Sequence, residues 1–162
     1  MKFVMIIVLV SLCWYVGFGF SKYYGNRSEF FKEFVFFLNK VSLNINFSKD
    51  KLKTILTDYK TSSKELSLIL KNFLGCLEQK NLSEKQLFNG CKLLKQEEKS
   101  TLLSFFQSLG HFDLVGQTKH LENFAKDFEL RQKQAEEEKN KYAPLFTKLG
   151  LIVGVIISLI LL

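Results

Sequence analysis

Two histidines are the side chains of this 162-residue chain best suited to metal or acid–base chemistry. His111 and His120 lie nine residues apart, which matches no zinc-binding spacing such as His-x-x-x-His, and no acidic partner stands at metal spacing beside them. We therefore expect no metal site. The sequence predicts instead that His111 fills a turn and that His120 lies on the surface of a helix.

Other catalytic signals are also missing from the sequence. It contains no GxxxxGK[ST], GxSxG or GxGxxG motif, so it lacks the usual phosphate cradle and nucleophile elbow. Cys13, Cys76 and Cys91 are odd in number and form no CxxC pair, which favours free thiols in a reducing compartment. We expect a protein that is not an enzyme and binds no cofactor. If ATP is used, a partner uses it.

A helix stop followed at once by a helix start is predicted at residues 109–121. Gly110 suits the left-handed residue just past a helix C-terminus. Asp113 suits an N-cap, because its carboxylate can accept the free N–H groups of the next turn. From Leu114 a helical pattern runs to about Lys141 and points at the C-terminal apolar segment.

The segment between the apolar ends is predicted to be helical throughout. Apolar and polar residues show no sustained alternation with a period of two, as strands would, and the sequence has a single proline. Apolar residues at helical spacing predict helices over about 28–45, 48–59, 63–77, 83–91 and 96–109, before the helix at 114–141. The first of these carries many phenylalanines, which we interpret as core or membrane-surface packing rather than a cofactor site. The predicted fold is an all-α antiparallel bundle of five or six helices joined by short turns.

The last helix becomes highly charged at residues 133–141, which is typical of a solvated stalk with local ion pairs, while a docking site is the alternative. Pro144 follows the stalk. Because proline lacks an N–H and clashes with the preceding turn, we expect the helix to kink or stop there.

Both ends of the chain are apolar, and we expect transmembrane helices over residues 1–21 and 145–162, flanking a helical domain at 22–144. The charge-free run that begins at Leu149 is short for a bilayer, so the second span has to include residues 145–148. The Lys148 side chain would then extend along the helix until its charge reaches the membrane surface. A cleaved signal peptide is the alternative for the first span. Its apolar run is longer than a signal core, and no small-x-small site precedes Ser21, so an uncleaved anchor is favoured.

Small residues recur every four positions in both spans. Gly150, Gly154 and Ser158 form one smooth stripe, and Cys13 and Gly17 begin a similar one that ends at Ser21. Such stripes let another helix backbone approach closely, either the other span or a helix of another subunit, including a second copy of the chain. Glycine is common in membrane helices, so ordinary composition remains the alternative.

The net charge of +7 is unevenly distributed. Residues 22–64 carry nine basic and four acidic side chains, and the rest of the segment between the spans is balanced. A basic stretch after a membrane span indicates contact with anionic lipid heads or orientation by the positive-inside rule, and no nucleic-acid-binding motif occurs. We expect the helical domain to be cytoplasmic and both termini to be outside.

The C-terminal third resembles the stage III sporulation protein AB family. The resemblance rests, in order, on Leu109-Gly110, Asp113, Gln117, Lys119-His120, Lys141-Tyr142, Leu149-Gly150 and Gly154. Chain length, the N-terminal span and the helical middle agree with that family, while Pro144 departs from its stalk pattern. That family is similar to the cytoplasmic domains of platform proteins of type II secretion and type IV pilus systems.

The resemblance implies a role in the mother cell of an endospore-forming bacterium, at the outer forespore membrane. It implies the sporulation ATPase, stage III protein AA, and other stage III channel proteins as partners, and Gly110, Asp113, Gln117, His120, Gly150 and Gly154 as structural or interaction residues. The expected function is a non-enzymatic platform that couples the ATPase to a trans-envelope complex. A membrane-anchored scaffold or signalling protein without an ATPase is the alternative.

Overall fold

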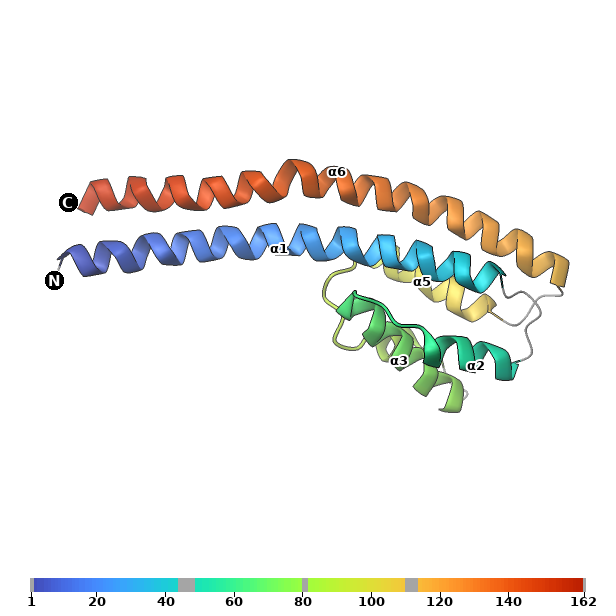
Figure 1. Cartoon of the computed structure of the whole chain (residues 1–162). Coiled ribbons are helices and arrows are strands. Elements are labelled where there is room, and N and C mark those ends of the chain that lie inside the picture. The colour runs from blue at the N-terminus through green and yellow to red at the C-terminus, as the bar shows by residue number, and fades with distance from the viewer. Residues whose placement is uncertain (1, 44–48, 80–81, 110–113, 162) are drawn as a thin grey trace. The chain divides into compact units, whose positions relative to one another are not determined.

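The computed structural model describes residues 2–43, 49–79, 82–109 and 114–161, with side chains described over 5–43, 53–79, 82–109 and 121–160. The helices are α1 (Lys2–Leu43), α2 (Lys49–Asp58), α3 (Lys64–Gln79), α4 (Glu84–Leu87), α5 (Gln96–Ser108) and α6 (Leu114–Leu161). Within these ranges no strand occurs, so the prediction of an all-α protein is confirmed (Figure 1).

The chain forms two compact units. Unit 1 comprises Met1–Ser28 and Lys133–Leu162, and unit 2 comprises Glu29–Gln132. The long helices α1 and α6 each contribute a segment to both units, whereas α2, α3, α4 and α5 belong to unit 2 alone. The two units are defined by contacts within the protein, whereas the predicted boundaries at residues 21 and 145 are those of membrane spans. These membrane boundaries stay predictions.

Both long helices have apolar segments that are long enough to cross a membrane. In each helix, only 6% of the most apolar 18-residue stretch is buried inside the protein. These segments therefore differ from the core helix of a soluble protein, which is mostly buried. In unit 1, α1 and α6 run antiparallel, and Figure 1 shows the two chain termini at the same end of the pair.

The structure corrects two expected helix boundaries. We expected a new helix to begin at about residue 28, but α1 continues unbroken to Leu43. We also expected the last helix to kink or stop at Pro144; α6 does not stop there, and a kink stays a prediction. One proline removes only one helical hydrogen bond, and the carbonyl that it frees belongs to Asn140, which is exposed and can bind water instead.

Phenylalanine rings build the core of unit 2. Eight of them are at most 2% exposed: Phe30, Phe31, Phe34, Phe37, Phe73, Phe105, Phe106 and Phe128. The ring of Phe34 lies at the centre, with its centroid 4.5 Å from that of Phe128 on α6 and 5.5 Å from that of Phe105 on α5. Phe73 brings α3 into the same core through Phe106, at 4.5 Å. The interpretation of these phenylalanines as packing residues is therefore confirmed.

Serine side chains cap the starts of α3 and α4. Ser63 Oγ accepts a hydrogen bond from the N–H of Leu66, and Ser83 Oγ accepts one from the N–H of Gln86. The Ser83 hydroxyl also donates to Gln86 Oε1 at 3.0 Å. These bonds satisfy N–H groups that a helix start leaves free. The N-cap predicted at Ser48 lies outside the described residues.

The connection from α2 to α3 is attached to α1 through Glu33. The Glu33 carboxylate accepts hydrogen bonds from the hydroxyls of Thr61 at 2.9 Å and Ser62 at 3.0 Å, and its backbone carbonyl accepts one from Tyr59. Burial, together with the charge of Glu33, raises the pKa of Tyr59 to about 12. The phenol therefore stays protonated, and able to donate this bond, across the physiological range.

We predict that Phe34→Ala destabilises unit 2 severely. The change removes a side chain whose ring touches three helices, and truncations of buried phenylalanines typically cost about 3–5 kcal/mol. The measurement is chemical unfolding of the detergent-solubilised chain, followed by near-ultraviolet circular dichroism. Phe36→Ala on the same helix is the matched control, because Phe36 is 55% exposed. Equal losses for the two variants would contradict this description of the core.

Candidate functional site

In unit 1, α1 and α6 touch backbone to backbone at two glycines. A Cβ added to Gly17 would lie 2.5 Å from the carbonyl oxygen of Phe146 and 3.2 Å from Cα of Gly150. A Cβ added to Gly150 would lie 2.7 Å from the carbonyl oxygen of Cys13. Because these neighbours are backbone atoms, a side chain at either position would force the two helices apart.

Gly154 continues the same contact by one helical turn. Its position is buried, and an added Cβ would lie 3.1 Å from Cα of Val10 and 3.4 Å from Cβ of Cys13. The small-residue stripe of α6 therefore faces α1 of the same chain. We call the contacting faces of α1 and α6 in unit 1 the seam.

Aromatic rings replace glycine further along the seam. Phe20 of α1 stacks on Phe146 of α6, with 5.3 Å between ring centroids. Tyr24 stacks on the same Phe146 ring at 5.9 Å and on Tyr142 at 5.4 Å. Wider side chains need a wider gap between helices, so the seam changes from backbone contact to ring contact where the apolar segments end.

An ion pair follows the aromatic rings. Arg27 Nε lies 3.8 Å from Glu138 Oε2, and the Arg27 side chain is only 8% exposed. Buried ion pairs contribute little net stability, but loss of one partner leaves an uncompensated charge and is costly. Glu138 is 33% exposed, so the pair is buried on the Arg27 side only, and a shift of α1 against α6 that separated the two side chains would leave the Arg27 charge uncompensated. Ala135, 2% exposed, extends the seam beyond it.

The seam positions on α1 follow the spacing of a coiled coil. They are Val10, Cys13, Gly17, Phe20, Tyr24 and Arg27. The alternating steps of three and four residues keep one face of a helix against its neighbour. The stripe predicted from the sequence used a strict step of four residues, from Cys13 through Gly17 to Ser21. It therefore did not include the seam residues Phe20, Tyr24 and Arg27. The alternating steps were the signal that could have revealed them.

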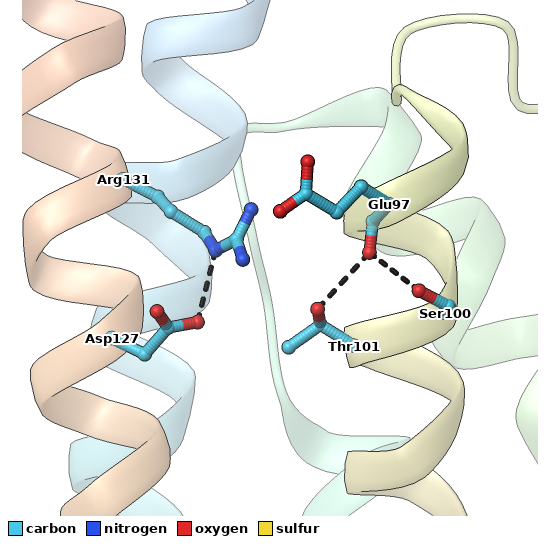
Figure 2. Close-up of polar contacts among 5 residues, drawn as sticks. All are labelled: Glu97, Ser100, Thr101, Asp127 and Arg131. Atoms are coloured by element: carbon cyan, nitrogen blue, oxygen red, sulfur yellow. Dashed lines mark hydrogen bonds and ion pairs between the residues drawn. The ribbon is translucent and has the colours of Figure 1, made fainter.

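In unit 2, polar side chains of α5 and α6 face one another (Figure 2). Arg131 donates to Asp127 at 2.9 Å, and its guanidinium carbon lies 5.9 Å from the centroid of the Phe128 ring. Figure 2 shows the side chains of Glu97 and Arg131 pointing toward one another across the two helices. The Glu97 backbone carbonyl accepts bonds from two hydroxyls of α5 at 2.8 and 3.0 Å. Both hydrogen bonds lie within α5, so they stabilise that helix and do not connect it to α6.

The described residues show no convergent set for metal binding, because no three His, Cys, Asp or Glu side chains gather among them. Burial raises the pKa of both Cys76 and Cys91. These thiols are therefore protonated and weakly nucleophilic at neutral pH. Cys13 lies half-buried in the seam.

The structure describes only part of the predicted site. Gly150 and Gly154 lie together in the seam. Gln117 and His120 belong to α6, but their side chains are outside the described residues, as are Gly110, His111 and Asp113 altogether. The predicted N-cap at Asp113 and the predicted roles of these residues therefore stay predictions.

Comparison with known proteins gives one match. The model of a family described as stage III sporulation protein AB matches residues 2–162, which is nearly the whole chain. No curated protein and no solved structure matches the chain.

We predict that Gly154→Cys forms an intrachain disulfide with Cys13. The two Cβ atoms would lie 3.4 Å apart, close to the separation of about 3.5–4.5 Å found in disulfides. Oxidation of the membrane-embedded variant should give a faster-migrating band on non-reducing gels. Val153→Cys is the matched control, because Val153 is 45% exposed and should not cross-link.

Gly17→Ile in the Gly154→Cys background should lower the cross-linked fraction to the level of the control. The new side chain cannot fit against the Phe146 carbonyl, so the helices must separate. The segment stays apolar and should still insert. An undiminished cross-link would show that the backbone contact is unnecessary for pairing of α1 and α6.

Proposed function

The chain belongs to the stage III sporulation protein AB family, and from this premise we propose that it is a non-enzymatic platform in a trans-envelope complex similar to type II secretion systems. In this proposal, the chain couples a cytoplasmic ATPase, stage III protein AA, to a channel between mother cell and forespore. It lies in the outer forespore membrane on the mother-cell side, where other stage III channel proteins contact it.

The observation that supports this role best is the continuity of α1 and α6. Each helix runs without a break from an apolar segment of unit 1 into the helical unit 2. A protein built in this way can connect a soluble partner to a membrane assembly through two helices. A platform needs such a connection and needs no catalytic group of its own. The lack of a phosphate-binding motif in the sequence agrees with ATP hydrolysis by a partner.

The proposed topology places unit 2 in the cytoplasm and both chain termini outside. Lys22 and Arg27 follow the apolar segment of α1, and Lys139 and Lys141 precede that of α6, while Lys2 is the only basic side chain beyond the spans. Positive side chains near membrane spans are retained on the cytoplasmic side. The same bias would orient a scaffold or signalling protein, so topology does not separate the two functions.

Retention of the ATPase tests the platform function against the scaffold alternative. We predict that the full chain, solubilised in detergent from sporulating cells, retains stage III protein AA together with other stage III proteins. Phe34→Ala should lose the ATPase because unit 2 loses its core, and Phe36→Ala should serve as the control. A chain that retains stage III proteins but no ATPase would favour the scaffold.

Labelling of Lys85→Cys tests the topology. Lys85 is exposed in unit 2, and the native Cys76 and Cys91 are buried. A membrane-impermeant maleimide should therefore label the variant only after intact vegetative cells that produce it are permeabilised. Labelling before permeabilisation would place unit 2 outside and overturn the proposed topology.

A further inference from the structure

Four lysines form a belt around unit 1 where its apolar surface ends. Lys22 on α1 and Lys139, Lys141 and Lys148 on α6 are all exposed. No aspartate or glutamate lies within six residues of Lys22 or Lys148 along the chain, whereas three glutamates of unit 1, Glu136 to Glu138, directly precede Lys139. Arg27 does not belong to it, because its guanidinium turns into the seam beside Glu138.

The belt lies at the edge of the exposed apolar surface of unit 1. Lys22 follows Phe20, which is 52% exposed, by two residues, and Lys148 lies between the exposed apolar residues Leu145 and Leu149. Tyr23, 37% exposed, stands beside Lys22. Exposed tyrosines and lysines at the end of an apolar segment are typical of the membrane–water interface.

The four ammonium groups can reach one level of a bilayer. Lys139 and Lys148 are separated by roughly 14 Å along α6, at 1.5 Å per residue. The headgroup region on each side of a bilayer is about 5–7 Å thick. Lysine side chains extend along apolar surface until the charge reaches water or headgroups, so Lys148 can extend outward while Lys139 and Lys141 extend toward the membrane.

From this placement we propose that the lysine belt of unit 1 binds anionic phospholipid headgroups and enriches such lipids around α1 and α6. The inference rests on the proposed membrane position of these helices. Lipid suits the belt better than an acidic protein partner, because exposed apolar side chains flank Lys22 on α1 and Lys148 on α6. Each lysine near an anionic surface favours binding by roughly fivefold.

Trp14 provides a direct probe of the surrounding lipid. It is the single tryptophan of the chain, and it is 51% exposed on the apolar segment of α1. Lipids brominated in mid-chain quench tryptophan fluorescence on contact. The full chain would be reconstituted in mixed vesicles of phosphatidylglycerol and phosphatidylcholine, with one lipid brominated in each series. The quenching curves give the relative affinity of the protein for the two lipids.

We expect wild-type protein to prefer phosphatidylglycerol by about fivefold or more, and high salt to weaken the preference. The triple variant K22Q/K141Q/K148Q should show a ratio near one. The control K71Q/K85Q/K92Q removes the same charge from exposed lysines of unit 2 and should keep the wild-type preference.

Three outcomes would overturn the proposal. Equal quenching of wild-type Trp14 by both brominated lipids would show that the belt does not select anionic headgroups. Equal loss of the preference in both triple variants would assign it to net charge rather than to the belt. If neither lipid quenches Trp14, α1 is not in the bilayer, and the platform function fails as well. Selection of phosphatidylglycerol by a chain that retains no ATPase would refute the platform function alone.

Discussion

Within a bilayer, two apolar helices gain almost nothing by moving side chains out of lipid, because lipid tails are as apolar as leucine. In the proposed membrane position, association of α1 with α6 therefore depends on how closely their backbones approach. Gly17 and Gly150 remove the two side chains that would keep the backbones apart, and Gly154 extends the contact by one turn. The order of unit 1 depends on this constraint.

Beyond the glycines, the seam changes its chemistry in an order that fits the proposed membrane boundary. Stacked rings of Phe20, Tyr24 and Phe146 follow where the apolar surface ends, and tyrosine suits a level at which one end of the ring is wet. The ion pair of Arg27 and Glu138 comes next. Each class of contact is placed where its surroundings make it favourable, so the seam specifies both the pairing and the alignment of the helices.

Unit 2 depends on a different force, because water surrounds it in the proposed topology. Burial of phenylalanine rings from α1, α3, α5 and α6 drives its folding, with Phe34 in the centre. The two units thus use separate sources of stability, yet α1 and α6 belong to both. In the proposed function, a partner bound to unit 2 would act on helices that continue into the seam.

Much of this protein could be predicted from its sequence, because local patterns carry that information. Apolar spacing predicted the helical class, and the structure consists of helices α1 to α6 over the described residues. Only the tertiary structure showed that α1 continues past Ser28 and α6 past Pro144. Packing along α1 outweighs the weak local preferences of Gly25 and Asn26, and the exposed Pro144 removes only one hydrogen bond from a long helix. It also decided that the glycine stripe of α6 faces α1. Periodicity shows which face of a helix is smooth or apolar, but the helix that covers this face depends on contacts between residues more than a hundred positions apart.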